Sequence, residues 1–127
     1  MAAGFTANVL LAMGASPVMA HAASEVEEMT AGADGLVLNV GTVSEDLLSS
    51  MVRAGRRAAS LGKPVILDPV GVGATTYRCH VVRTLLETLE IRVIRGNPSE
   101  ILSLTDTVPR TCRRSLNARR TSPQTAV

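Results

Sequence analysis

Short apolar runs alternate with stretches of helical spacing along the first hundred residues. Three runs have the length and composition of strands: Leu36–Val40, Pro64–Leu67 and Ile91–Ile94. Each consists mostly of Val, Leu and Ile, as expected for strands buried on both faces of a sheet. Because helical segments separate them, the pattern predicts an α/β fold in which helices cover a mostly parallel sheet.

The helices are expected where apolar residues recur every three to four positions. They cover Phe5–Met13, 25–32, 45–61, Tyr77–Leu89 and a segment from Pro98 onward. Ser24 and Glu27 have capping-box spacing, and Ser44 and Asn97 also stand where a helix begins. We therefore expect side chains to fix the beginnings of these three helices.

The amino-acid composition argues against several classes of function. A length of 127 residues fits one domain, and the single Phe, single Tyr and absent Trp argue against a surface that stacks on nucleic-acid bases. The two cysteines lack Cys-x-x-Cys spacing, so no zinc or redox site is indicated and a reducing, cytoplasmic setting is expected. No apolar stretch approaches the roughly 18 residues of a membrane helix. We expect neither a nucleic-acid nor a membrane partner.

Charge divides the chain near residue 107. Residues 1–106 carry a net charge of −3, whereas residues 107–127 contain five arginines and no acidic residue. The second segment also has no periodic apolar face, so we expect one domain over residues 1–106 and a disordered Arg-rich tail over 107–127. The alternative is an RNA-binding or localising arm, although its arginine pairs are not densely clustered.

The N-terminal residues partly imitate a signal peptide. Val9–Met13 is apolar, and Ala20-His21-Ala22 has the small residues of a cleavage site. However, no Lys or Arg precedes Arg53, so the positive region of a signal peptide is missing. Export is the less favoured alternative to a cytoplasmic location.

Polar residues suited to ligand binding or catalysis follow two of the predicted strands. Ligands bind at these strand ends in parallel sheets. Asp68 can hold a hydrated magnesium ion or a polar substrate group, or it can simply cap a turn before Pro69. Arg95 precedes the helix start at Asn97, and a guanidinium with free helix N–H groups favours phosphate oxygens. Alternatively, Arg95 is an ordinary surface residue and Glu100 only completes the helix cap.

Four ordered motifs resemble those of the hydroxyethylthiazole kinase family. They lie at residues 5–19, at Asn39-Val40-Gly41-Thr42, at residues 67–74 with Tyr77-Arg78, and at residues 94–102. The resemblance covers about residues 5–106, the amino-terminal part of the family's chain. It implies a ribokinase-like fold, a homotrimer, and ATP- and Mg²⁺-dependent phosphorylation of 4-methyl-5-(2-hydroxyethyl)thiazole in thiamine salvage.

The resemblance also implies roles for four residues. Met19 would contact the thiazole and Arg95 the ATP phosphates, while Asp68 and Glu100 would organise magnesium and its waters. These residue types suit phosphoryl transfer, which depends mostly on positioning and charge neutralisation.

The chain departs from the family in one functional motif. The family's Gly-Thr-Gly-Cys segment, which supplies an anion hole and the group nearest the substrate hydroxyl, belongs to a carboxy-terminal half that is not present here. We therefore expect a truncated, ribokinase-like domain that contains no catalytic residue and is inactive alone, with a tail that resembles translation in a wrong frame or a fused foreign end. The alternatives are a fragment that only binds thiazole and a nucleotide-dependent oxidoreductase, which the missing glycine fingerprint disfavours.

Overall fold

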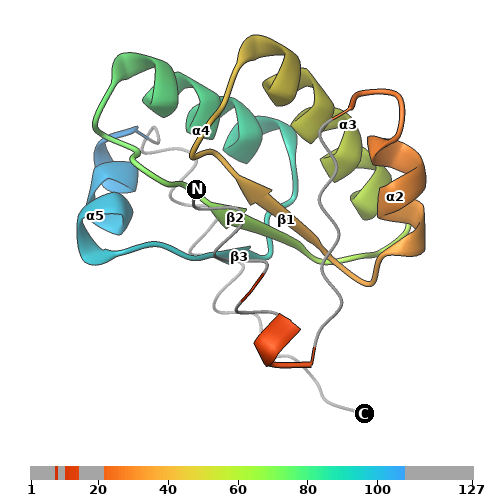
Figure 1. Ribbon diagram of the computed structural model, residues 1–127. Coiled ribbons are helices and arrows are strands. Elements are labelled where there is room, and N and C mark those ends of the chain that lie inside the picture. The colour runs from red at the N-terminus through yellow and green to blue at the C-terminus, as the bar shows by residue number, and fades with distance from the viewer. Residues whose placement is uncertain (1–7, 9–10, 15–21, 108–127) are drawn as a thin grey trace, which may run out of the picture.

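The computed structural model describes residues 8, 11–14 and 22–107, which form a parallel three-stranded sheet with helices packed against it (Figure 1). The elements in chain order are α2 (Val26–Gly32), β1 (Leu36–Asn39), α3 (Glu45–Ser60), β2 (Val65–Asp68), α4 (Thr76–Thr88), β3 (Val93–Ile94) and α5 (Pro98–Thr107). The strands lie in the order β1-β2-β3, and both pairs are parallel. The predicted α/β class and the predicted neighbouring strands are confirmed.

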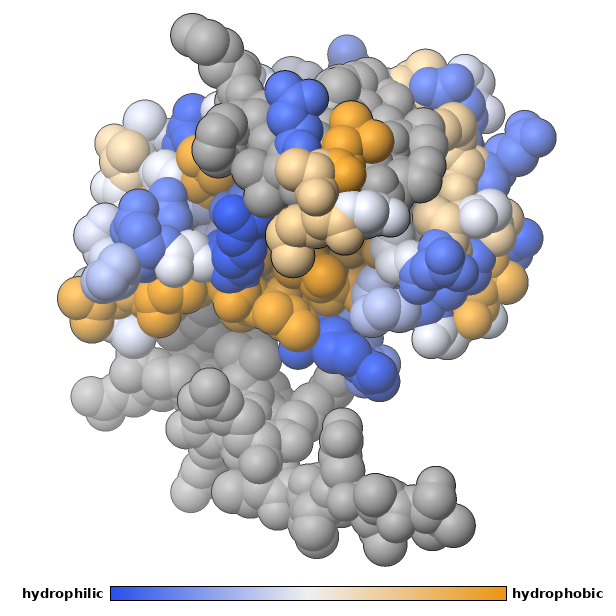
Figure 2. All heavy atoms as spheres, turned by 60° about the horizontal axis from the view of Figure 1, so that its bottom comes forward, coloured by the Kyte–Doolittle hydropathy of each residue, from blue (hydrophilic) through white to orange (hydrophobic). Residues whose placement is uncertain are grey.

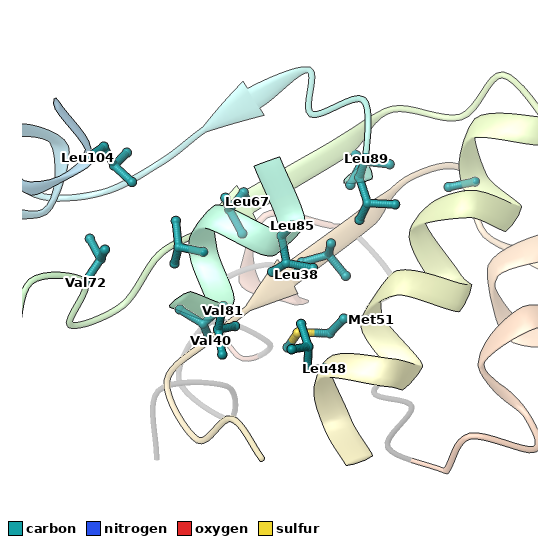
Figure 3. Close-up of a cluster of buried hydrophobic side chains, with 13 residues drawn as sticks. Leu38, Val40, Leu48, Met51, Leu67, Val72, Val81, Leu85, Leu89 and Leu104 are labelled. Carbon is teal, nitrogen blue, oxygen red and sulfur yellow. The ribbon is translucent and has the colours of Figure 1, made fainter. Parts of the chain in front are cut away.

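Helices α2 to α5 make one layer over the sheet (Figure 1). α3 and α4 lie side by side over it in Figure 1, while α2 packs on α3 and α5 packs on α4. Leu38 of β1 and Leu67 of β2 are opposite one another in the register, and Leu85 of α4 lies over them in the core (Figure 3). The buried apolar cluster consists of Leu38, Val40, Leu48, Met51, Ala58, Val65, Leu67, Val72, Val81, Val82, Leu85, Leu89 and Leu104.

The opposite face of the sheet is less covered than the sequence predicts. Val37, Ile66 and Val93 are paired across the three strands and form one apolar row. Val37 is 44% exposed and Val93 49% exposed. The expectation that every strand is buried on both faces is therefore wrong for the outer strands, because α2, α3, α4 and α5 pack together on the other side.

Strand β3 is also shorter than predicted. It contains only Val93 and Ile94, although Arg92 N–H donates to Val65 O at 2.8 Å and Arg95 N–H donates to Leu67 O at 2.9 Å. These two hydrogen bonds continue the contact with β2 on either side of the strand. They also fix the backbone from which the Arg95 side chain projects.

Of the three predicted side-chain caps, those by Ser44 and Asn97 form and the one by Ser24 does not. The Ser44 hydroxyl accepts a hydrogen bond from Leu47 N–H at 3.3 Å, so the predicted cap of α3 is confirmed. By contrast, α2 begins at Val26 with Glu25 as its N-cap, and no side chain caps it. The Ser24–Glu27 capping box is wrong, because a turn closed by Glu25 N–H and Ala22 O precedes the helix and moves its start along the chain.

Some predicted features lie outside the described residues. They include most of the Phe5–Met13 helix, Met19 and the tail after Thr107. Within the described part of the chain, no helix is both long enough and apolar enough to cross a membrane.

Candidate functional site

Three polar side chains stand at the carboxyl ends of the three strands. Asn39 ends β1 and is opposite Asp68, which ends β2. Arg95 directly follows β3 and is exposed. Because the strands are parallel and adjacent, one edge of the sheet brings together residues far apart in the sequence. This edge is where ligands bind in sheets of this class.

Asp68 is the buried acid of the site, with 9% of its surface exposed. Its Oδ2 accepts a hydrogen bond from Asn39 Nδ2 at 3.2 Å. Burial raises the pKa of the Asp68 carboxyl above its ordinary value of 3.8, and the negative charge of Glu100 raises it further. The positive charge of Arg95 and the hydrogen bond from Asn39 oppose this rise in the pKa. The charges of both Arg95 and Glu100 therefore act on the Asp68 carboxyl.

Glu100 joins helix α5 to the loop after β2. Its Oε2 accepts from Asn97 N–H at 2.9 Å, and Asn97 Oδ1 accepts from Glu100 N–H at 2.9 Å. This reciprocal pair is a capping box, so the alternative role considered for Glu100 is confirmed. Its Oε1 accepts from Gly71 N–H at 3.0 Å.

The capping box changes one expectation about phosphate binding. The N–H groups of Asn97 and Glu100 already donate to side-chain oxygens of the same turn. The prediction that the start of this helix offers free N–H groups is therefore wrong for these two residues. The guanidinium of Arg95 remains exposed to solvent at the same edge of the sheet.

Arg78, in the first turn of α4, connects two loops at this edge. Its Nη1 donates to Val70 O at 2.6 Å, and its Nη2 donates to Gly41 O at 2.9 Å. Gly71 has a φ of +70°, which favours glycine, and a Cβ there would lie 2.5 Å from Arg78 Nη1. The loop thus needs glycine for both its backbone conformation and its contact with Arg78.

Asn39 and Arg78 belong to the motifs that resemble the family, but the sequence alone assigned neither residue a role in the site. Asn39 could have been found because it ends its strand at the position that corresponds to Asp68. Arg78 carries a positive charge in the first turn of a helix, where the helix dipole disfavours it. Such a placement indicates that the guanidinium has a specific partner.

The two carboxylates fit a hydrated magnesium ion. Among the described residues there is no cluster of three or more His, Cys, Asp or Glu side chains placed to hold a metal. Mg²⁺, however, usually keeps several waters and uses one or two carboxylates together with substrate phosphates. Asp68 and Glu100 provide such a pair, close enough for the charge of one to raise the pKa of the other.

Comparison with known proteins places this arrangement in a family. The model of the hydroxyethylthiazole kinase family matches residues 1–123, which extends beyond the four motifs at both ends. Proteins called hydroxyethylthiazole kinase from Desulfotalea psychrophila and Chloroflexus aggregans are 60% and 58% identical over 100 and 99 residues. These regions are 79% and 78% of this chain, but only 37% and 36% of the relatives.

A solved structure agrees with the sequence comparison. The hydroxyethylthiazole kinase of Pyrococcus horikoshii OT3 superposes with a TM-score of 0.75 at 50% sequence identity. The match covers 80% of this chain and 40% of that one. The chain therefore spans about two fifths of the relatives that it matches, and it belongs to the hydroxyethylthiazole kinase family.

Proposed function

We propose that this chain provides the amino-terminal part of an enzyme that transfers a phosphoryl group from ATP to the primary alcohol of 4-methyl-5-(2-hydroxyethyl)thiazole. The observation that carries the proposal is the meeting of Asp68, Glu100 and Arg95 at one edge of the sheet, where Asp68 experiences both other charges. The names of the relatives support the same activity. The product is a thiazole phosphate, which serves thiamine synthesis.

Each site residue has a proposed task. Arg95 holds phosphate oxygens of ATP, for which an exposed guanidinium is well suited. Asp68 and Glu100 hold Mg²⁺ through its waters, and the ion supplies neutralisation of phosphate charge during transfer. Met19 contacts the thiazole ring. The hydrogen bonds from Asn39 and Gly71 keep the two carboxylates oriented while they do so.

The remaining chemistry is assigned to the part of the enzyme that corresponds to the other three fifths of the relatives. Phosphorylation of an alcohol needs a group that accepts its proton and donors that stabilise the transferring phosphoryl. The tasks assigned above to Asp68, Glu100 and Arg95 include neither. We propose that the complete enzyme is a cytoplasmic homotrimer, and that this chain alone binds ligands without turning them over.

The test compares this chain with a version joined after Asp106 to the carboxy-terminal part of the Desulfotalea psychrophila relative. Formation of thiazole phosphate from ATP, Mg²⁺ and the thiazole alcohol is measured for both. We expect activity only in the extended chain, because losing one positioned donor already costs about 10²–10³ in rate. Comparable turnover by both chains would contradict the proposed division of tasks.

A pair of matched variants in the extended chain tests the arginine assignment. Arg95→Ala should lower the rate by about 10²–10³ if the guanidinium stabilises the phosphoryl group. Arg92→Ala removes a second exposed arginine three residues earlier and should leave the rate unchanged. Equal rates in the two variants would remove Arg95 from the site.

A further inference from the structure

A chain of hydrogen bonds links the two carboxylates of the site through Arg78. Asn39 Nδ2 donates to Asp68 Oδ2 at 3.2 Å, and Asn39 Oδ1 accepts from Gly41 N–H at 2.8 Å. The carbonyl of the same Gly41 accepts from Arg78 Nη2 at 2.9 Å. The path therefore runs from the acid that ends β2 to the loop after β1, and from there to helix α4.

The second half of the path reaches Glu100. Arg78 Nη1 donates to Val70 O at 2.6 Å. The next residue, Gly71, donates its N–H to Glu100 Oε1 at 3.0 Å. One guanidinium thus holds the loop after β1 and the loop after β2. The first loop is hydrogen-bonded to Asn39, which contacts the Asp68 carboxylate, and the second donates directly to the Glu100 carboxylate.

The geometry points to Arg78 as a positioning residue that sets the relative placement of Asp68 and Glu100 for a divalent cation. This inference rests on the proposed function, because it assigns a purpose to the spacing of its two acids. Among the described residues, the path from Arg78 to the two acids runs through Gly41, Asn39, Val70 and Gly71. The planar fork of a guanidinium suits this task because two of its N–H groups reach carbonyls of different loops at once.

Whether removal of Arg78 strengthens or weakens cation binding distinguishes a positioning role from a purely electrostatic one. A positive charge beside a cation site repels the cation, so its removal should strengthen cation binding if charge alone mattered. If Arg78 positions the carboxylates, its removal should weaken binding instead. Groups that orient metal ligands typically contribute about 10- to 100-fold to metal affinity.

The test measures Mn²⁺ binding to the full 127-residue chain and to Arg78→Ala and Arg78→Lys. Mn²⁺ prefers carboxylate and water ligands, as Mg²⁺ does, and its binding can be followed by paramagnetic broadening. We expect about 10- to 100-fold weaker binding in both variants. Lysine keeps the charge but cannot hold both carbonyls with the same geometry. Arg56→Ala, which removes an exposed arginine of α3, is the matched control and should bind normally.

A second readout needs no metal. Hydrogen exchange of the Gly71 amide reports directly whether its bond to Glu100 is held. We expect about tenfold faster exchange in the Arg78 variants, as when hydrogen bonds that hold a loop are removed, with unchanged exchange in β2 and the middle of α4. If the wild-type chain binds no Mn²⁺, the metal assignment of the proposed function fails, and this readout still decides the role of Arg78.

Three results would overturn the inference. The first is unchanged Gly71 exchange in both variants, and the second is unchanged or tighter Mn²⁺ binding. The third is loss of the folded state in both Arg78→Ala and Arg78→Lys, measured by circular dichroism, because Arg78 would then support the whole fold rather than the placement of two side chains.

Discussion

Asp68 is a residue on whose pKa burial and the positive charge of Arg95 act in opposite directions. Burial is the largest influence and raises its pKa, although Arg95 and Asn39 lower it. A buried carboxylate whose negative charge is only partly neutralised by its neighbours destabilises the folded state when no cation is bound. Such a residue is expected where binding matters more than stability, since sites often retain groups that a fold alone would not favour.

Asp68→Asn should therefore stabilise the chain at neutral pH. The folded pKa lies above the ordinary 3.8, so protonation favours folding. This stabilisation by protonation is fully present below pH 3.8, and it is lost as the pH rises through the pKa of Asp68 in the folded state. Asparagine carries no charge and can still accept from Asn39. Urea unfolding at pH 7 should show a higher midpoint for the variant, with the difference shrinking as the pH is lowered.

The control for this variant is Asp34→Asn, which makes the same chemical change at an exposed position. Its midpoint should stay close to that of the wild type at every pH. A lower midpoint for Asp68→Asn at pH 7 would mean that the charge of Arg95 outweighs burial.

Gly71 is a second residue whose identity the site requires. Alanine there would have to adopt a left-handed backbone, and its Cβ would meet Arg78 Nη1. We expect Gly71→Ala to lower the free energy of unfolding by about 1–2 kcal/mol in urea titrations. Gly32→Ala is the matched control, because its Cβ has nothing within 4 Å, and it should be neutral or stabilising by about 0.4–1 kcal/mol. Equal changes in the free energy of unfolding for Gly71→Ala and Gly32→Ala would contradict a strained contact at Gly71.

At the scale of elements, the contrast between two serines tests what makes a helix begin. Ser44 has an extended backbone and its hydroxyl caps α3, whereas Ser24 lies in a turn and caps nothing in α2. Ser44→Ala should lower the free energy of unfolding by about 1 kcal/mol. Ser24→Ala should change it by less than about 0.5 kcal/mol. Thermal unfolding of the two variants side by side measures the difference, and similar losses would refute it.

The elements were predictable to the extent that their signals were local. Ser44, Asn97 and Glu100 act within one helical turn, and the sequence predicted each of their caps. The strand core was predictable because Leu36–Val40 and Pro64–Leu67 are apolar apart from Asn39. The extent of β3 was not, because β3 pairs with Ile66 and Leu67 of β2, which are distant in the sequence. The contacts of Arg78 were unpredictable for the same reason, since Gly41 is 37 positions away.

At the scale of the whole molecule, the described sheet has two unequal faces. One contains the core beneath α3 and α4, and the other presents the row Val37, Ile66 and Val93. Figure 2 shows hydrophobic side chains gathered on this side of the described residues. Moreover, β3 is an edge strand in the described sheet. An apolar face that ends in an open strand edge favours association.

We therefore expect the purified 127-residue chain to self-associate through this row. Val37→Lys combined with Val93→Lys should shift light-scattering and sedimentation profiles toward the monomer, because lysines on exposed strands oppose pairing and cover the face with charge. Both valines are roughly half exposed, so the replacements should leave the core and its circular dichroism intact. Leu61→Lys combined with Leu102→Lys adds the same two charges at exposed apolar residues outside the strands, just after α3 and in α5, and controls for charge alone. If this control pair disperses the chain as well as the Val37–Val93 pair does, net charge rather than the Val37–Ile66–Val93 row limits solubility.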